Sequence, residues 1–395
     1  MKNYLRLLIL TGVLILSVIF IGGKFAWGIV LLLFIFFISG LLLGNIFHKG
    51  IVLMLWHSRN EFISGENVTF NLVLSNTGVG FAPWVRMDME LPKKLSGKNE
   101  KGKLLFVGPI SRVNANYSFD TRYKGYYRFE NVKIHYSDIF HLFHWTKAFD
   151  DSYTFIVKPK LKKLSGFESR VRQPFGKYRS KNAAFEDLSS IKDIRKYQTG
   201  DSFKKMHWKI SAHRGELFIR EPEASGSAEL IVVLDLYHDS YGKDDFLRYG
   251  EEEACGECVA AIVYKAFREG KNVKMHYYTE KLNTVKLEVE KGMDPVLELL
   301  ASTEGNSSFP VSEFIKYECG KFGNQSEIFI VTNDISKSFD AETIGTKFNN
   351  ITVLSNRKLY TERTTSMLIE AGLRMKSFSC SEETVMIGET EIEKG

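Results

Sequence analysis

The sequence predicts a chain of mixed fold, in which a two-helix transmembrane hairpin precedes an all-β sandwich domain and an α/β domain. Three observations support this prediction. Two apolar segments stand at the N-terminus, short alternating strands follow them, and apolar strands then alternate with helical stretches. The 395 residues exceed one ordinary domain of about 100 to 200 residues. We divide the chain into the hairpin (1–50), the β domain (51–158), a basic linker (159–227) and the α/β domain (228–395).

The hairpin is predicted from residues 5–21 and 27–46, which are almost entirely apolar. At about 1.5 Å per residue the second segment spans a hydrocarbon core of about 30 Å, whereas the first is slightly short. A cleaved signal peptide is the alternative for the first segment, but no cleavage site of small residues follows it. We therefore expect a cell-membrane protein that crosses the bilayer more than once.

The charges that flank the hairpin predict its orientation. Lys2 and Arg6 stand at its N-terminal end, Lys24 alone stands in the loop between the helices, and the residues that follow it include His48, Lys49 and Arg59. Because basic residues favour the cytoplasmic side, we expect both termini and the soluble domains to be cytoplasmic.

The β domain is predicted from alternation with a period of two. Residues 67–74, 85–91 and 126–136 alternate between apolar and polar side chains, and turn residues separate them. Short strands without a helical stretch favour an antiparallel sandwich or barrel. Its aromatic end, at Phe140, Phe143 and Trp145, is predicted to be core.

The α/β domain is predicted from strands that alternate with helices. The expected strands are 230–234, 273–278, 285–289 at an edge, 327–332, 351–355 and 373–378, and the expected helices are 245–268, 295–301 and 311–316. This order predicts right-handed crossovers and a mostly parallel sheet. Ligands of such sheets bind at the carboxyl ends of the strands, where Asp235 and Asp334 stand.

Positive charge is concentrated in one segment. The chain carries a net charge of +6, but residues 158–220 hold seventeen Lys and Arg against six Asp and Glu, a net of +11. The four cysteines are too few for a disulfide framework, which favours a reducing compartment. Cys255 and Cys258 form a Cys-x-x-Cys pair inside the apolar stripe of the helix at 245–268, so we predict core packing for them, with a redox or metal role as the alternative.

Residues 195–221 form a signature between the two domains. It reads Arg-Lys-Tyr-Gln-Thr-Gly-Asp at 195–201, His-Trp-Lys at 207–209 and Ser-Ala-His-Arg-Gly-Glu-Leu at 211–217. This segment resembles the signature of the bacterial domain of unknown function family fifty-eight. Gly-Tyr-Tyr at 125–127 and Asp-Ile-Phe at 138–140 follow the same family order, whereas His213 stands where the family usually has Arg.

The resemblance implies several properties. Members of that family carry a C-terminal domain similar to von Willebrand factor A, so an α/β domain of that type is expected here. They are commonly encoded beside MoxR-type AAA+ ATPases and are thought to act as membrane-bound partners of them. We therefore expect a cytoplasmic protein partner, with a MoxR-type AAA+ ATPase as the implied candidate.

The signature residues suit a docking surface. The predicted docking residues are Arg195, Tyr197, Gly200, Asp201, Lys204, Lys205, His207, Trp208, Lys209, Ser211, Arg214, Gly215, Arg220 and Glu221. The cations can contact carboxylates or phosphates, and Tyr197 and Trp208 offer stacking surfaces. In the alternative interpretation Trp208 packs on the α/β sheet and the cations are merely solvated.

A metal site is weighed at the first strand of the α/β domain. A von Willebrand A domain that binds Mg²⁺ uses Asp-x-Ser-x-Ser there, because small hydroxyls let several oxygens reach the ion. Here Tyr237 and Asp239 stand where the two serines are expected. We predict no cofactor and no metal, with Mg²⁺ at Asp235, Asp239 and Asp334 as the alternative.

The sequence contains no phosphate-binding loop, no Gly-x-Ser-x-Gly elbow and no His-Glu-x-x-His helix, so we do not expect an enzyme. The prediction is a membrane-anchored scaffold or adaptor that acts through protein–protein interaction. Two alternatives stay open: a metal-dependent adhesion or binding module, and a binder of anionic lipid or nucleic acid through the basic segment. We do not expect nucleic acid as the partner.

Overall fold

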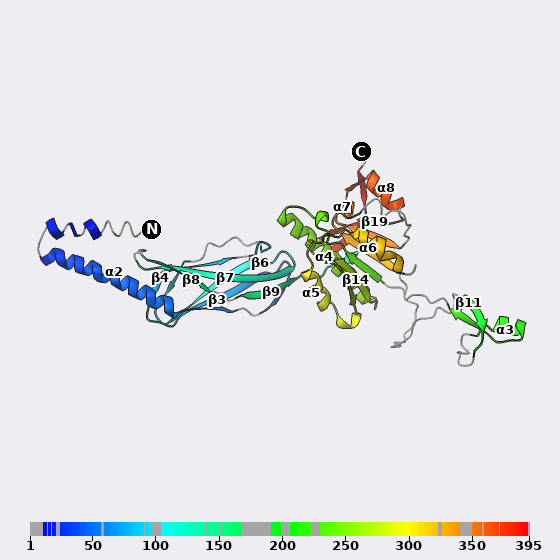
Figure 1. Cartoon of the computed structure of the whole chain (residues 1–395), viewed down its shortest axis with the longest axis horizontal. Helices are drawn as coiled ribbons and strands as arrows, with labels where there is room; N and C mark the ends of the chain where they lie inside the picture. Colours follow the sequence, from blue (N-terminus) through cyan, green and yellow to red (C-terminus); the bar gives the residue numbers. More distant parts are fainter. Residues whose placement is uncertain are drawn as a thin grey trace. The chain divides into compact units, whose positions relative to one another are not determined.

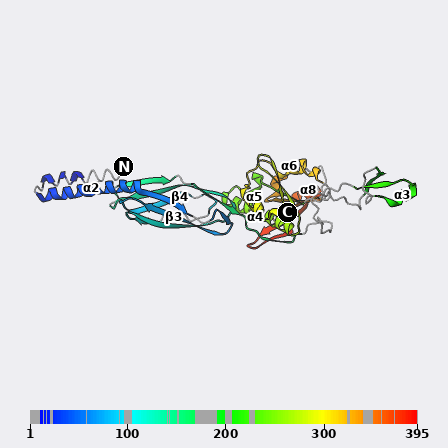
Figure 2. The same ribbon diagram turned by 90° about the horizontal axis from the view of Figure 1, so that it is seen from below.

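The computed structural model (Figures 1 and 2) describes most of the chain. The described residues are 11–13, 15–16, 18–20, 24–56, 59–90, 92–95, 104–139, 141, 143–149, 152–167, 191–198, 206–222, 230–322, 326–339, 350–357, 359–370 and 372–393. The chain divides into two compact units, residues 1–158 and 159–395. The fold is mixed, with several sheets in each unit.

The described part of the first unit contains helix α2 (Lys24–Gly50) and nine strands. The strands are β1 (Ile51–Trp56), β2 (Glu61–Ile63), β3 (Asn67–Asn76), β4 (Ala82–Glu90), β5 (Leu104–Val107), β6 (Ser111–Asp120), β7 (Gly125–Ser137), β8 (His144–Phe149) and β9 (Tyr153–Lys158). They form one sheet in the order β1-β3-β6 and a second in the order β2-β9-β7-β4-β5, in which β8 also pairs with β7. Both sheets contribute to one apolar core.

Alternating burial explains the register of this domain. Along β3, Val68, Phe70, Leu72 and Leu74 are all buried at alternate positions. The predicted strands at 67–74, 85–91 and 126–136 correspond to β3, β4 and β7. Phe143 is 9% exposed and Trp145 packs against the core, as expected for the aromatic end, whereas Phe140 lies outside the described residues.

One described helix is long and apolar enough to cross a membrane, over Trp27–Gly50. Thr11–Phe20 forms a shorter apolar helix, and the rest of the first predicted span lies outside the described residues. Lys24, expected in the loop between the helices, is the first residue of α2. The described residues therefore support one candidate span, and the two-helix hairpin stays a prediction.

The second unit is built on an eight-stranded sheet in the order β10-β20-β19-β17-β16-β13-β14-β15. Its strands are β10 (Lys163–Ser165), β13 (Leu230–Leu234), β14 (Val273–Tyr278), β15 (Leu282–Leu287), β16 (Glu327–Thr332), β17 (Ile351–Ser355), β19 (Arg374–Cys380) and β20 (Thr384–Glu389). The strands from β14 through β19 in the sheet order are parallel to one another, whereas β15 and β20 are antiparallel to their neighbours β14 and β19. A small parallel pair joins β18 (Leu359–Thr361) and β21 (Glu391–Glu393).

Helices cover both faces of this sheet. They are α4 (Asp245–Arg268), α5 (Asp294–Ser302), α6 (Val311–Tyr317), α7 (Ile335–Ser338) and α8 (Glu362–Glu370), with short 3₁₀ helices η2 (His238–Ser240), η3 (Val289–Lys291) and η4 (Cys319–Lys321). Leu230, Val232 and Leu234 of β13 point into the core beneath α4 and α5. Ile231 and Val233 point into the second core, beneath α6, α7 and α8. Because both faces of β13 are buried in this way, its residues do not alternate between apolar and polar.

Two sequence interpretations need correction in this unit. The edge strand expected at 285–289 is β15, which begins at Leu282 because a tight turn precedes it, in which the Thr279 N–H donates to the Lys281 carbonyl (3.0 Å). The segment interpreted as a basic linker also contains regular structure. β10 pairs with β20 in the main sheet, and residues further along form a separate small module described below.

Candidate functional site

The sequence signature folds into a small module, which we call the signature module. It consists of β11 (Ile191–Lys196), α3 (Trp208–Arg214) and β12 (Phe218–Pro222). The two strands pair antiparallel, with Arg195 opposite Ile219 and Lys196 opposite Phe218. The Tyr197 N–H extends this ladder by donating to the Leu217 carbonyl (2.8 Å). A two-stranded ribbon is marginal in isolation, so the helix must add to its stability.

Two signature residues delimit the helix of the module. The side chain of His207 caps its start, because Nδ1 accepts from the Ile210 N–H (3.3 Å). Gly215 ends it at φ +68°, a left-handed conformation that glycine adopts without strain, and its N–H donates to the Ser211 carbonyl (3.0 Å). These residues therefore have structural roles.

Ser211 joins the helix to the ribbon. Its side chain is buried, and its Oγ accepts from the Phe218 N–H (2.8 Å). Met206, Phe218 and Ile219 form the small apolar interior, each at most 6% exposed. The fold of the module itself therefore explains two residues of the His-Trp-Lys-x-Ser pattern, His207 and Ser211.

Three signature side chains of the helix, Trp208, Lys209 and Arg214, are exposed, whereas Tyr197 of the ribbon is half-buried. The Trp208 side chain is 63% exposed, so the described residues of the signature module do not bury it. The alternative in which it packs on the α/β sheet stays open. Lys209 and Arg214 are also exposed, and the guanidinium of Arg214 lies 5.6 Å from the Phe218 ring centroid. Lys196 forms an exposed ion pair with Glu216 (2.5 Å). Such a pair contributes little to stability in water, about 0 to 1 kcal/mol.

Several predicted docking residues cannot be placed. Gly200, Asp201, Lys204 and Lys205 lie outside the described residues, and for Arg220 and Glu221, in β12, only the backbone is described. Arg195 is half-buried, and its guanidinium donates to the Lys196 carbonyl (3.2 Å). Their role in docking stays a prediction.

A second polar group lies at the carboxyl ends of β13 and β16, which are adjacent in the sheet. We call it the strand-end cluster, and it comprises Asp235, Ser240, Thr332, Asn333, Asp334 and Arg357. It stands where the strand order reverses direction, the position at which doubly wound sheets usually bind ligands.

Asp235 is the centre of the strand-end cluster. It is 2% exposed, and burial raises the pKa of its carboxyl above the ordinary value of 3.8. Its Oδ2 accepts from the hydroxyls of Thr332 (2.6 Å) and Ser240 (3.0 Å). Its Oδ1 accepts from the Tyr237 N–H (3.0 Å). The carboxylate is therefore occupied by neighbouring donors of the chain.

The other two metal candidates point to different partners. Asp334 accepts from the Arg357 guanidinium (2.7 Å) and from the Ser336 hydroxyl (2.5 Å). Asp239 is exposed and accepts from the Tyr237 hydroxyl (3.1 Å). In the described part of the chain, no three His, Cys, Asp or Glu side chains gather as a metal site would require. The arrangement does not favour Mg²⁺, because Arg357 already supplies positive charge to Asp334 and Tyr237 occupies a ligand position.

The Cys-x-x-Cys pair lies in the core. Cys255 and Cys258 are 1% and 0% exposed in the middle of α4, and both thiols are free. Burial raises the pKa of Cys258 well above its usual value, which disfavours the reactive thiolate. The predicted core packing is confirmed.

Sequence reasoning missed the partners of the strand-end carboxylates. Thr332 is the last residue of a predicted strand, and Ser240 lies five residues after Asp235, so both could have been proposed as neighbours. Arg357 comes from a distant loop after β17, and no local pattern connects it with Asp334.

Comparisons with known proteins identify relatives of unknown function. A family model described as protein of unknown function DUF58 matches residues 193–314, which include most of the signature module and the strand-end residues Asp235 and Ser240. The "uncharacterized protein YeaD" of Bacillus subtilis (strain 168) is 23% identical over 253 residues, or 62% of this chain. The match spans 61% of the length of that relative. A solved family 123 glycoside hydrolase from Clostridium perfringens covers 85% of this chain and 73% of its own, at 10% identity and a TM-score of 0.18, a level too low to support an argument about fold.

Proposed function

The chain belongs to the DUF58 family of proteins of unknown function, and from this premise we propose that it is a membrane-anchored, non-enzymatic adaptor that recruits a cytoplasmic protein through the signature module. A MoxR-type AAA+ ATPase is the proposed partner, as the family resemblance implies. The proposal includes the two-helix hairpin and cytoplasmic soluble domains. The single candidate span over Trp27–Gly50 supports membrane association.

One observation carries the docking role. Trp208 begins a helix whose caps and ribbon contacts come from other residues, yet its own side chain is 63% exposed. A tryptophan left in water forgoes the favourable free energy of burying its large apolar surface. Aromatic side chains flanked by cations are typical of the centres of protein interfaces. Lys209 and Arg214 provide those cations.

We further infer that the α/β domain is von Willebrand factor A-like. The sheet order β15-β14-β13-β16-β17-β19, with β15 antiparallel at the edge, supports this inference. The metal-binding version of such a domain is disfavoured here, since the oxygens of Asp235 and Asp334 are hydrogen-bonded to other side chains.

A photo-cross-linking experiment in the native membrane tests the docking role. A photoreactive phenylalanine replaces Trp208 in the full chain, and a matched chain carries it at Tyr126, which is 59% exposed in the first unit. We expect a discrete protein adduct from position 208 alone, weakened by Lys209→Ala and Arg214→Ala and by added salt. Adduct formation at neither position, with the chain intact in the membrane, contradicts the adaptor proposal.

The same experiment separates the alternatives. An adduct that is sensitive to nuclease or extracts with lipid, rather than one with protein, favours the nucleic-acid or anionic-lipid alternative. The adhesion alternative has its own measurement, the melting temperature of the full chain with millimolar Mg²⁺. Binding to the native state alone would raise it by mass action, and we expect no rise.

A further inference from the structure

The C-terminal half of α2 packs against the β domain. The Phe37 and Phe143 ring centroids lie 4.9 Å apart. Phe47 is fully buried and meets the edge of Tyr136 at 4.9 Å. Helix α2 ends at Gly50 and β1 starts at Ile51, so no linker separates the helix from the domain. The helix and the domain therefore move as one body.

Glycines make this approach possible. A Cβ on Gly44 would lie 2.1 Å from the Trp145 ring, and a Cβ on Gly80 would lie 2.5 Å from the backbone nitrogen of Phe47. Lys147 fixes the helix end, since its ammonium donates to the His48 carbonyl (3.1 Å), one of the last in the helix. Larger side chains at these glycines would push the helix away from the domain.

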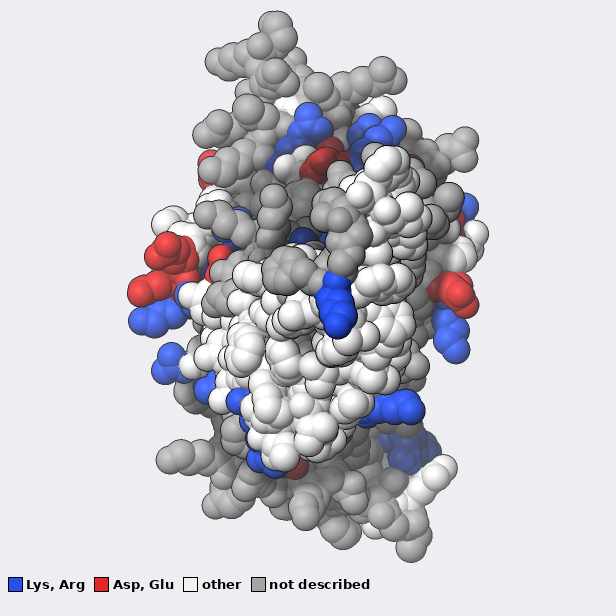
Figure 3. Space-filling view, turned by 90° about the vertical axis from the view of Figure 1, so that its left-hand side faces the viewer, with Lys and Arg blue, Asp and Glu red and all other residues white. Residues whose placement is uncertain are grey.

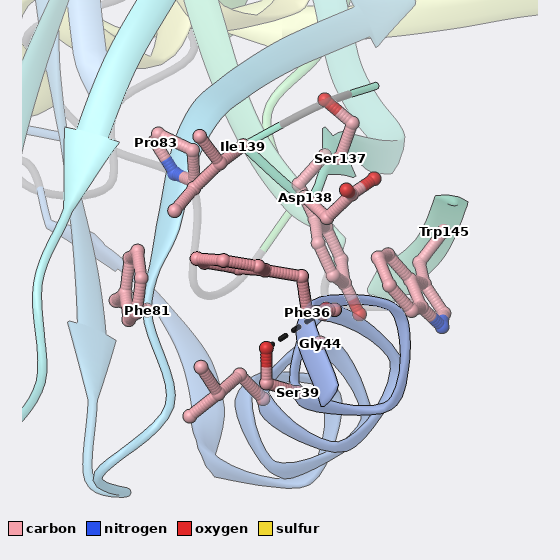
Figure 4. Close-up of a pocket in the computed structure, with 12 residues that line it drawn as sticks. Phe36, Ser39, Gly44, Phe81, Pro83, Ser137, Asp138, Ile139 and Trp145 are labelled. Carbon is pink, nitrogen blue, oxygen red and sulfur yellow. Dashed lines mark hydrogen bonds between the residues drawn. The ribbon is translucent and has the colours of Figure 1, made fainter. Parts of the chain in front are cut away.

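A cleft of about 230 Å³ lies between the helix and the domain. Its walls are Phe36, Ser39, Gly40, Leu43 and Gly44 of α2, and Phe81, Pro83, Tyr136, Ser137, Asp138, Ile139 and Trp145 of the β domain. Figure 4 shows Phe36 extending from the helix toward Phe81 and Pro83, with Trp145 beside Gly44. The lining is mainly apolar, and Ser137 and Asp138 add polar atoms.

The length of the helix places this cleft at membrane depth. Residues 24–35 precede the first cleft residue, and at 1.5 Å per residue they cover about 18 Å. A hydrocarbon core of about 30 Å needs about 20 residues. Counted from Trp27, where the candidate span begins, that length ends at Ile46 and includes all the helix residues of the cleft. Ser39, the one polar side chain in the stretch, donates to the Phe36 carbonyl (2.8 Å), which suits an apolar surrounding.

Strand β4 and two loops of the β domain expose apolar side chains. Trp84, Ile110 and Ile139 are 40%, 75% and 53% exposed. Ile110 has φ +45° and His141 has φ +54°, conformations that are strained for residues other than glycine and often mark functional loops. Figure 3 looks along the chain from the side that carries α2, and side chains other than Lys, Arg, Asp and Glu cover a broad area there, with basic side chains both within it and at its edges. Such a surface is typical of a membrane interface.

We propose that this cleft opens to the bilayer and holds a phospholipid acyl chain, so that the helix-proximal end of the β domain reaches into the bilayer. The apolar wall from Phe36 to Ile139 contacts the chain, and Ser137 and Asp138 stand at its polar end. The inference rests on the proposed anchoring by α2.

Fluorescence quenching by lipid tests the inference. The full chain is placed in phosphatidylcholine and phosphatidylglycerol vesicles, with Trp145 as its single tryptophan after Trp27→Phe, Trp56→Phe, Trp84→Phe and Trp208→Phe. Lipids with a doxyl group on the upper acyl chain should quench Trp145. Gly40→Leu should fill the cleft and relieve the quenching, because a Cβ there meets nothing closer than 3.6 Å. Gly28→Leu, on the part of the helix where a Cβ meets nothing within 4 Å, is the matched control and should leave the quenching unchanged.

The outcomes separate the cleft from the anchor. A dye on Leu31→Cys, at a position 61% exposed on α2, reports anchoring by itself. If the dye is quenched and Trp145 is not, the cleft holds no lipid and the inference is overturned. If neither is quenched, the anchoring itself fails. Equal quenching of Trp145 in Gly40→Leu and Gly28→Leu also overturns the inference. Stronger quenching after deletion of residues 1–20 overturns it as well, because it would mean that this segment, and not lipid, fills the cleft in the full chain.

Discussion

The signature module and the strand-end cluster both gather polar side chains, but they use them in opposite ways. In the strand-end cluster, the carboxylates of Asp235 and Asp334 are hydrogen-bonded by Thr332, Ser240 and Arg357. In the signature module, buried contacts are made by a few residues, and Trp208 and the nearby cations remain at the surface.

This difference separates two kinds of sequence motif. A buried polar group must be satisfied within the protein, and once satisfied it stabilises the fold without offering a ligand site. An exposed aromatic side chain gains free energy when a partner covers it. We therefore propose a structural role for the strand-end cluster and a binding role for the signature module, and the predictions below test that proposal.

The largest effect is expected from Asp235→Ala. The change leaves the buried hydroxyls of Thr332 and Ser240 and the Tyr237 N–H without their acceptor, at a cost of about 2 to 4 kcal/mol in the free energy of unfolding. Hydrogen exchange of β13 and β16 amides in the full chain measures it. Asp239→Ala, at an exposed carboxylate, is the control and should change exchange little. Equal effects from the two changes would show that Asp235 is not a structural centre.

The pH dependence of stability tests the same residue. Burial raises the pKa of Asp235 in the folded chain above its unfolded value, so the folded state binds the proton more tightly. Its contribution is therefore fully present below the unfolded pKa of about 3.9 and is lost as pH rises through the folded pKa. The slope of the unfolding free energy against pH should be flatter in Asp235→Asn than in the wild type. Glu257→Gln serves as the comparison, because burial also raises the pKa of Glu257 despite its ion pair with Lys162. An unchanged slope in Asp235→Asn would indicate that this carboxyl is not perturbed.

Much of the α/β domain follows from the sequence because its signals are local. The helix α4 (Asp245–Arg268) and the strands β13, β14, β16 and β17 have long apolar patterns that need no distant partner to be recognised. The strand β20 was missed because its residues alternate only weakly and its place depends on a hairpin with β19. Strand β10 pairs with β20 although more than two hundred residues separate them in the sequence. A pattern read over a short stretch of sequence cannot predict such a pairing.

The candidate sites were only partly predictable for the same reason. The sequence located the signature, but the distinction between the structural Ser211 and the exposed Trp208 depends on which face of a short helix meets the ribbon. The helix-proximal cleft was not anticipated at all. In the sequence, Gly40 and Gly44 are ordinary residues of an apolar helix. Their role, which is to let Asp138 and Trp145 approach the helix closely, follows only from the structure.

A smaller effect is expected inside the signature module. Ser211→Ala removes the acceptor of the buried Phe218 N–H and should weaken the module by about 1 to 3 kcal/mol. Gly215→Ala forces a left-handed conformation on alanine and should cost about 1 kcal/mol. Hydrogen exchange of the Phe218 and Tyr197 amides reports both changes. Protection unchanged in Ser211→Ala would mean that the helix does not stabilise the ribbon.

The smallest effect on stability, and the sharpest test of the comparison, is expected from Trp208→Ala. A buried tryptophan lost from a core costs about 3 to 5 kcal/mol, whereas a surface substitution usually stays within about 0.5 kcal/mol. Since the Trp208 side chain is 63% exposed, we expect the Phe218 amide to keep its protection in Trp208→Ala and in Lys209→Ala. Cross-linking to the partner from a second photoreactive site, at the exposed Leu217, should nevertheless fall in both variants. We expect the larger fall in Trp208→Ala, because an aromatic anchor contributes to the lifetime of a complex. A peripheral cation such as Lys209 contributes mainly to the rate at which the complex forms. A Trp208→Ala chain that loses protection at Phe218 would make this tryptophan a packing residue and would remove the distinction between the two polar regions. A chain that keeps both protection and cross-linking would leave the module folded and would deny Trp208 the role of anchor.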